Sequence, residues 1–440
     1  MTGEKYQEMY LQMVLNNQER YKEDYKKTVE SVASSTAIYK GKPVPFLYNP
    51  MFFSKKEEED LEWIGKMMME IGESVTDRYI QDEDFRKKFG FPDFIERMIL
   101  RENKYGVHVP IGRFDVFYGD RENFKFCELN TDGSSAMNED NTIGKILLRS
   151  RAMEDFVKEH PVRNPELVET WVNESIKIYK KWDNTGRKPR VAIVDFTESG
   201  TSAEFQLFKE TYEKAGYSCI IADPRDLKYM DGGLYHQDYR IDLVYRRIVT
   251  FELIEKYEQA RDFVDAYMDD AVCVVGTIRS QVIHNKIFFK ILHDQDTLEG
   301  LEEGQREFVK RHIPFTGIFK GEKEVFEEVL RNKDKYIIKP MDMNASQGVY
   351  PGRDFKEDKW ESILKDTFNK DFIYQEFVAP YQREFVVYED GRFKKESLGS
   401  IVGIFMYNRK YSGLYTRLGK NNIISGVTDY YCAPNMIVNT

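Results

Sequence analysis

Histidine and cysteine are scarce in this sequence, which has only six histidines and four cysteines among its 440 residues. The cysteines show no CxxC spacing and lie among apolar or aromatic neighbours, as buried reduced thiols commonly do. We therefore expect neither a disulfide framework nor a zinc site. The sequence also lacks any apolar run near the roughly 20 residues that cross a bilayer, and no apolar signal segment follows Met1. These absences predict a cytoplasmic protein that does not insert into membranes.

A net positive charge and several familiar catalytic motifs are missing as well. The formal net charge is −10, which argues against binding of nucleic acid, because phosphate backbones require a basic footprint. No Walker A pattern, HExxH, nucleophile elbow or GxGxxG occurs, so the corresponding NTPases, zinc proteases, hydrolases and dinucleotide enzymes are not indicated. A chain of 440 residues exceeds one ordinary core, and two or three domains are expected.

The most informative segment that is present reads as a β-hairpin. Residues 111–118 (IGRFDVFY) and 124–130 (FKFCELN) alternate as strands do, and the residues between them, 119–123 (GDREN), have the composition of a turn. Within the second strand Cys127 should alternate away from its neighbour Glu128. We therefore expect the thiol to face the core rather than to act as a nucleophile.

The register of this hairpin brings four polar side chains together. If its centre lies midway along the turn, Asp115 faces Glu128 and Arg113 faces Asn130, and all four share one face because side chains alternate with period two. Two facing carboxylates repel each other unless something neutralises them. Two carboxylates and an amide oxygen form a hard ligand set that suits Mg²⁺ together with water and phosphate oxygens. The alternative is a surface hairpin whose arginine neutralises its acids.

The rest of the chain divides by pattern. Apolar residues at helical spacing predict a helical N-terminal region over residues 1–104, and the hairpin is followed by further helices within 105–185. Short apolar strands separated by a helix predict a Rossmann-like α/β subdomain over 186–280. Residues 281–440 contain further strands and a hairpin around Asp390-Gly391. The fold class is therefore predicted as α/β (α+β).

Two loops are candidate anion sites. The loop after the apolar strand 191–194 contains Ser199, Gly200, Thr201 and Ser202, and its helix N-terminus could hold a substrate carboxylate or phosphate. An ordinary helix cap explains the same residues. The second loop follows Lys339, which ends the apolar strand 336–340 and should point toward solvent or an anion. Its small residues could cover phosphates with backbone N–H groups.

Together these parts resemble an ATP-grasp nucleotide site. A strand-end Lys339, a small-residue loop, the segment 375–378 (QEFV) and the acid–acid–amide ligands of the hairpin are its elements. In ordinary ATP-grasp enzymes the metal ligands follow the lysines, whereas here the hairpin precedes Lys286 and Lys339. With RxD before ExN, this order resembles the glutathionylspermidine synthase-like family of circularly permuted ATP-grasp ligases over residues 105–440. The loop after Lys339 departs from the pattern because it lacks multiple glycines.

The resemblance implies ATP and Mg²⁺ as cofactors and assigns a role to each motif. Arg113 would stabilise the transferring phosphoryl group, the lysines would contact phosphates, and backbone groups of 375–378 would bind adenine. Arg417 would contact phosphate or a substrate carboxylate. The implied residues are Asp115, Glu128 and Asn130 for the metal, Arg113 for catalysis, and Lys286, Lys339, Ser346, Gln347, Gly348, Gln375, Glu376, Phe377, Val378 and Arg417 for the nucleotide.

The activity that the resemblance implies is ATP-dependent formation of an amide from small-molecule carboxylate and amine substrates. The carboxylate attacks the γ-phosphate of ATP to give an acyl phosphate and ADP, and an amine then displaces phosphate. Positioning and charge neutralisation suffice for this chemistry. Two alternatives remain: a phosphotransferase that uses the same nucleotide site, and a non-catalytic nucleotide-binding module.

Overall fold

The computed structural model describes residues 1–199, 201–343, 346–426 and 430–439. The protein is a mixed α/β structure with several sheets, as the sequence predicted. Among the described residues, no helix combines the length and the apolar character that crossing a membrane requires.

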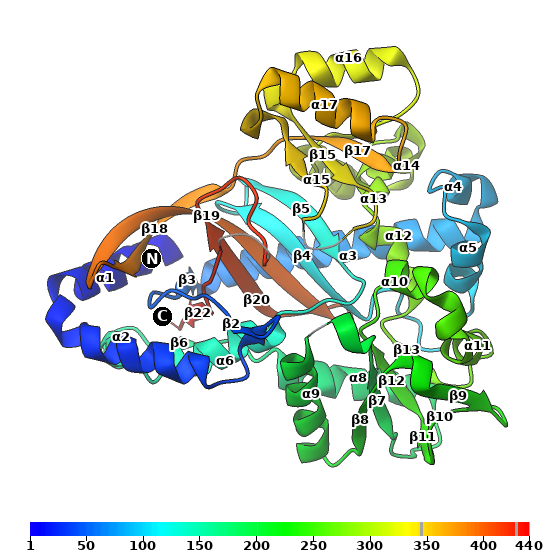
Figure 1. Ribbon diagram of the computed structural model, residues 1–440, viewed down its shortest axis with the longest axis horizontal. Helices are drawn as coiled ribbons and strands as arrows, with labels where there is room; N and C mark the ends of the chain where they lie inside the picture. The colour runs from blue at the N-terminus through cyan, green and yellow to red at the C-terminus, as the bar shows by residue number, and fades with distance from the viewer. Residues whose placement is uncertain (200, 344–345, 427–429, 440) are drawn as a thin grey trace.

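A six-stranded antiparallel sheet forms the centre of the molecule (Figure 1). Its strand order is β21-β20-β19-β4-β5, and β18 pairs with β19 beside this path. The predicted hairpin 111–130 therefore lies next to strands near the C-terminus, because β4 pairs with β19. The strands are β4 Ile111–Tyr118, β5 Phe124–Asn130, β18 Tyr381–Glu389, β19 Arg392–Tyr407, β20 Lys410–Gly419 and β21 Tyr431–Cys432.

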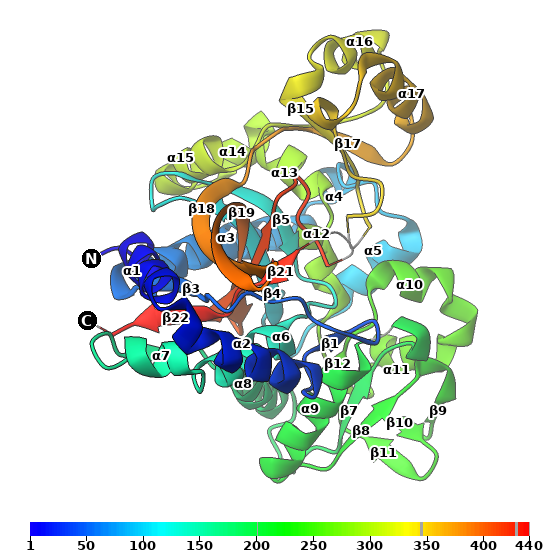
Figure 2. The same ribbon diagram turned by 60° about the vertical axis from the view of Figure 1, so that its left-hand side comes forward.

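The N-terminal region is helical, as predicted, but it also contributes strands. Met51–Ser54 (β3) pairs in parallel with Asn435–Val438 (β22), which joins the N-terminal region to the end of the chain. Figure 2 shows the two termini on the same side of the molecule. The other elements of this region are α1 Gly3–Asn16, α2 Gln18–Ala33, β1 Ile38–Tyr39, β2 Lys42–Pro43, α3 Lys55–Gln81, α4 Glu83–Lys87 and α5 Asp93–Leu100.

Helix α3 packs on the central sheet. It begins with a capping box in which the Ser54 side chain accepts from the Glu57 backbone and the Glu57 carboxylate accepts from Ser54. A Cβ atom at Gly65 would lie 2.7 Å from the sulfur of Met406 on β19. A glycine at this position therefore lets the helix approach the sheet closely.

A parallel-sheet unit occupies residues 191–275, shown in green in Figure 1. The strand pairs of its four-stranded sheet are all parallel, and the order β13-β12-β7-β8 places the switch in strand order between β7 and β12. Ligands of open α/β sheets commonly bind at this point, beyond the carboxyl ends of the strands. The unit contains β7 Val191–Val194, α9 Ser202–Lys214, β8 Cys219–Ala222, β12 Leu243–Arg246, α10 Thr250–Glu255, α11 Arg261–Met268 and β13 Cys273–Val275, with a small antiparallel sheet of β9 Leu227–Met230, β10 Gly233–His236 and β11 Tyr239–Ile241.

A separate four-stranded antiparallel sheet lies above the hairpin in Figure 1. Its helices cover a small core of its own, centred on Trp360 and Ile338. The unit comprises β14 Thr316–Ile318, α16 Lys323–Arg331, β15 Tyr336–Pro340, β16 Tyr350–Pro351, α17 Glu357–Thr367 and β17 Phe372–Glu376.

Short helices connect these units. Those after the hairpin lie where the sequence predicted helices, and those after residue 280 lead from the parallel-sheet unit toward β14. The helices are α6 Met137–Leu147, α7 Arg151–Phe156, α8 Val168–Trp182, α12 Gln281–His284, α13 Ile287–Leu292, α14 Gln295–Gly300 and α15 Glu303–His312. The short strand β6 Val162–Arg163 lies between α7 and α8 in the sequence.

Candidate functional site

The hairpin β4–β5 has the register that the sequence predicted. Arg113 pairs with Asn130 and Asp115 with Glu128, before the register shifts between Asp115 and Val116. This shift is a β-bulge, which re-aims side chains locally. Cys127 packs against core residues, as predicted, and it also lines a cavity beside Glu128. Burial raises the pKa of the Cys127 thiol to about 11, which keeps it protonated.

Two arginines neutralise Asp115, which is fully buried. Arg113 donates from Nε to Oδ1 at 2.7 Å and from Nη2 to Oδ2 at 3.0 Å. Arg417, on β20, donates to Oδ2 at 2.6 Å. The repulsion predicted between the facing carboxylates is therefore relieved by guanidinium groups, one of them from a strand 302 residues further along the chain.

Asn130 connects the two acids of the hairpin. Its Nδ2 lies 3.1 Å from Asp115 Oδ2 and 3.1 Å from Glu128 Oε1. Burial disfavours the charged form of Glu128, but nearby Lys286, Arg417 and Lys339 outweigh it and lower the pKa of this carboxyl to about 2. Glu128 is therefore ionised at neutral pH.

The three side chains fit a hard divalent cation by their chemistry. Two carboxylates and an amide converge, and rotation of the Asn130 amide by 180° would present its oxygen where Nδ2 now lies. No group of three His, Cys, Asp or Glu side chains that could hold a metal ion is found in the part of the chain that the structure describes. A metal at the hairpin therefore depends on the amide and on ligands from outside the protein.

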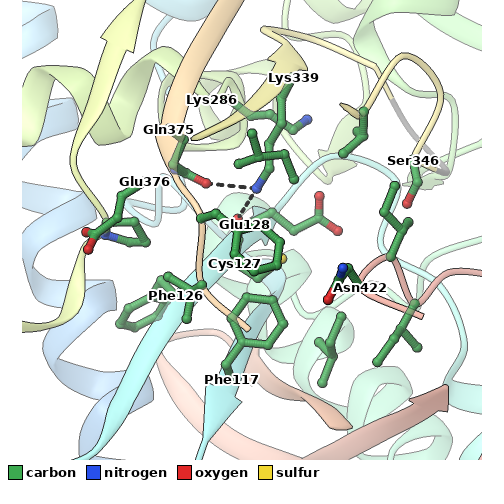
Figure 3. Close-up of a pocket in the computed structure, with 18 of the residues that line it drawn as sticks. Phe117, Phe126, Cys127, Glu128, Lys286, Lys339, Ser346, Gln375, Glu376 and Asn422 are labelled. Atoms are coloured by element: carbon green, nitrogen blue, oxygen red, sulfur yellow. Dashed lines mark hydrogen bonds between the residues drawn. The ribbon is translucent and has the colours of Figure 1, made fainter. Parts of the chain in front are cut away.

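The two predicted lysines lie on the other side of Glu128. Lys339, at the end of β15, donates to Gln375 Oε1 at 2.8 Å and to the Cys127 carbonyl at 3.3 Å. Figure 3 shows this contact with the Glu128 carboxylate beside it. Lys286 lies between α12 and α13, and burial lowers the pKa of its ammonium although Glu128 opposes this shift. Both lysines thus lie near the Glu128 carboxylate, and neither forms an ion pair within the part of the chain that the structure describes.

The first of two adjoining cavities is lined by the lysines and by apolar side chains. Phe117 and Phe126 of the hairpin form part of its wall, and the segment 375–378 of the β17 end forms another part (Figure 3). Apolar walls with a few charged groups are typical of sites for small molecules. Asn422, Ile423 and Ile424 also line this cavity and were missed by the sequence analysis, since nothing in their local pattern distinguishes them.

The second cavity, of about 300 Å³, is polar and lies between the hairpin and the parallel-sheet unit. It shares Glu128, Ser346 and Arg417 with the first cavity, so these residues form the boundary between the two. Arg113 and Asn130 line it as well.

Some predicted residues do not line either cavity. Gln347 and Gly348 are absent from both walls, although Gly348 adopts φ +68° and lies against Pro340. In the other candidate loop, Thr201 lines the second cavity but Ser202 does not, and Ser199 ends a short 3-10 turn. Gly200 lies outside the described residues.

The second cavity also contains acids that the sequence analysis missed. Glu139 lies in the first turn of α6, and Asp195 directly follows β7. Burial raises the pKa of each carboxyl to about 7. The position of Asp195 after a predicted parallel strand could have identified it, because ligands bind at the carboxyl ends of such strands. Glu139 had no comparable signal.

Comparisons with known proteins bear on the fold and the family of the chain. A solved structure of a glutathione synthetase-like effector from Globodera pallida matches 94% of this chain and 96% of its own, with a TM-score of 0.61 and 12% identity, which shows a shared fold. A D-alanyl-alanine synthetase A from Vibrio cholerae matches 57% of this chain and 88% of its own, with a TM-score of 0.30 and 13% identity. No curated protein sequence matches the chain. The model of the glutathionylspermidine synthase preATP-grasp family matches residues 18–297. The chain therefore belongs to the glutathionylspermidine synthase preATP-grasp family.

Proposed function

We propose that the protein is an ATP-dependent carboxylate–amine ligase that forms an amide through an acyl phosphate and releases ADP and phosphate. The observation that carries this proposal is the boundary between the two cavities, where Glu128 and Arg417 face both. A nucleotide in the first cavity would place its terminal phosphate at this boundary, next to a substrate in the second. Membership of a synthase family supports the same activity.

The residues at the boundary, those of the first cavity, and Asp115, which is buried next to Asn130, suit the roles proposed for them. Asp115, Glu128 and Asn130 would hold Mg²⁺, which neutralises phosphate charge when bound. Lys286 and Lys339 would contact ATP phosphates, and Arg113 would stabilise the transferring phosphoryl group. Backbone groups of 375–378 would bind the adenine edge. In this proposal the site has the ATP-grasp arrangement in circularly permuted order.

The chemistry requires little from side chains beyond positioning. A substrate carboxylate oxygen attacks the γ-phosphorus and ADP leaves, after which an amine nitrogen attacks the acyl carbon and phosphate leaves. Guanidinium and ammonium groups fixed in a buried site stabilise developing charge without reorganising. Arg113, held by Asp115 and by the Ser135 carbonyl at 3.0 Å, has such a fixed position.

The test is a matrix of small carboxylic acids and peptides against amines, with ATP and Mg²⁺. ADP and free phosphate should appear in equal amounts only when a matching acid and amine are both present, and mass spectrometry should detect the amide. Hydroxylamine should trap the activated acid as a hydroxamate. Phosphate found on an acceptor, with no amide in any pairing, would instead identify a phosphotransferase, and ATP binding without turnover a binding module.

The nucleotide site has its own prediction. Lys339→Ala should weaken ATP binding by about 2–5 kcal/mol, because it removes one partner of a desolvated charge pair. The matched control is Lys290→Ala, since Lys290 pairs with Asp294 and lines neither cavity. Calorimetric titration with ATP measures both variants. Unchanged affinity in a folded Lys339→Ala protein would place the nucleotide elsewhere.

A further inference from the structure

The second cavity contains a carboxyl group beside the proposed reaction centre. We propose that Glu139 accepts the proton that the attacking amine must lose, and is therefore a catalytic residue for the second half-reaction. This inference rests on the proposed ligase function and adds to it the group that makes the amine nucleophilic.

Glu139 and Arg113 both interact with the side chain of Tyr415. The Tyr415 hydroxyl donates a hydrogen bond to the Glu139 carboxylate. The Arg113 guanidinium carbon lies over the same Tyr415 ring, 5.3 Å from its centre. All three side chains line the second cavity. An acyl phosphate held by Arg113 would therefore lie close to the carboxyl group.

The backbone around Glu139 fixes this position. Ala136, just before α6, has a left-handed φ of +82°, and its N–H donates to Glu204 Oε2 at 3.1 Å. The N–H of Asn138 donates to the same oxygen at 3.1 Å. The first turn of α6 is thus anchored by the Glu204 carboxylate, and Glu139 projects from an ordered helix start.

One oxygen of the Glu139 carboxylate is left for a substrate. Tyr415 contacts Oε2, and the hydrogen bonds found among the described residues give Oε1 no donor. The charged and titratable groups that act on Glu139 come from several elements, and they are Arg113 on β4, Tyr415 and Arg417 on β20, Glu204 on α9, Tyr39 on β1, Tyr430 before β21 and Cys432 on β21.

The surroundings of Glu139 give its carboxyl group a pKa suited to proton transfer. Burial raises the pKa of Glu139 to about 7, while the Tyr415 hydrogen bond and the two arginines favour its ionised form. A general base is most effective when its pKa lies near the working pH. Glu128, with a pKa of about 2, is too weak a base for this role.

The proton balance of the second half-reaction requires such an acceptor. An alkylamine is protonated at neutral pH and has no free electron pair until it loses one proton. The nitrogen then attacks the acyl carbon, a C–N bond forms, the C–O bond to phosphate breaks, and phosphate leaves with the electron pair. Glu139 takes the first proton from nitrogen and returns it to water through the cavity, and the departing phosphate takes the second proton after the C–N bond has formed.

Asp195 is the other acid of raised pKa in this cavity, but its neighbours differ. The charged groups that act on it are Arg247, Glu252 and Arg246 of the parallel-sheet unit, and Arg113 is not among them. Its place at the carboxyl end of β7 is that of a group that binds the body of a substrate. The geometry therefore favours Glu139 as the proton acceptor.

The experiment compares two nucleophiles in Glu139→Gln, using the acid that yields a hydroxamate in the wild-type protein. Hydroxylamine is largely unprotonated at neutral pH and needs no base, whereas an alkylamine does. The variant should form hydroxamate at close to the wild-type rate, while amide formation with the alkylamine falls by about 100-fold or more. Gln retains an oxygen that accepts from Tyr415, so the packing of the ring is preserved.

Each other outcome has a defined meaning. Equal losses with both nucleophiles would show a structural role, and no loss with either would exclude a catalytic one, so both overturn the inference. A selective loss of amide formation in Asp195→Asn instead would assign the proton to Asp195. A wild-type protein that gives no hydroxamate with any acid would overturn the proposed function itself.

A second variant tests the pKa. Tyr415→Phe removes a hydrogen bond that favours ionised Glu139, so the pKa of this carboxyl should rise. The base must be ionised to act, so the rising limb of the amide-formation profile should move to higher pH. A profile that does not move would show that another group controls this limb.

Discussion

The Asp115 carboxylate is the anionic partner of two arginines at the centre of the site. Its carboxylate is enclosed by Arg113, Arg417 and the Asn130 amide, and none of it is exposed. From the hairpin register alone, the two facing acids should repel each other. Removing one of the two charges should then stabilise the metal-free protein. The arginines reverse this expectation, because each buried guanidinium now requires the carboxylate.

We therefore predict that Asp115→Asn lowers the free energy of unfolding by about 3–5 kcal/mol, the typical cost of breaking a buried ion pair from one side. Chemical denaturation without Mg²⁺ measures this change. Glu122→Gln is the control, because Glu122 pairs with Arg311 where both side chains are more than half exposed. An Asp115→Asn protein as stable as wild type would mean that the arginines find other partners.

At the scale of elements, two arginines at the end of β12 hold the loop between β5 and α6. Arg246 donates to Asp132 Oδ1 at 2.6 Å, with both side chains 1% exposed. Arg247 donates to Glu204 Oε1 at 2.8 Å, and Glu204 in turn caps α6. The parallel-sheet unit is thereby fixed to the loop that lines the second cavity. Because Glu204 already accepts from the N-terminal N–H groups of α6, that helix end is not open to a substrate anion.

Asp132→Asn should destabilise the protein by about 3–5 kcal/mol, because Arg246 would lose its buried anionic partner. By contrast, Glu327→Gln breaks a surface pair with Lys323 and should cost at most about 1 kcal/mol. Urea titrations of both variants provide the comparison. Similar stabilities in the two variants would show that the backbone acceptors around Arg246 suffice without Asp132.

At the scale of the whole molecule, the acids of the second cavity should make stability depend on pH. Burial raises the pKa values of Glu139 and Asp195 to about 7, from ordinary values of 4.5 and 3.8. Between these values the folded protein binds more protons than the unfolded chain. The stabilising contribution of these two carboxyl groups is therefore complete below their ordinary pKa values. It decreases as pH rises through about 7.

The melting temperature should accordingly fall between pH 5 and 8, and the double variant Glu139→Gln/Asp195→Asn should show a shallower fall. Calorimetric scans of both proteins across this range test the prediction. An identical slope in the double variant would assign the pH dependence to other groups.

The sequence by itself determined the hairpin and the register of its polar pairs. Alternation and turn composition predicted the bounds of β4 and β5 and the pairs Asp115–Glu128 and Arg113–Asn130, because pairing across a short turn is local and a shift by one residue would expose the wrong face. The turn at Asp390-Gly391 followed for the same reason, since φ values of +52° and +77° suit those residue types. The roles proposed for these residues and the division of the chain into four parts stay predictions.

Only the tertiary structure decided how distant segments complete the site. No local pattern could show that β19 pairs with β4, that Arg417 reaches Asp115, or that Glu139 shares a cavity with Arg113. Charge neutralisation and pKa depend on burial and on neighbours that come from any part of the chain. The sequence therefore placed the acids opposite each other, and the folded structure supplied the cations that make this arrangement stable.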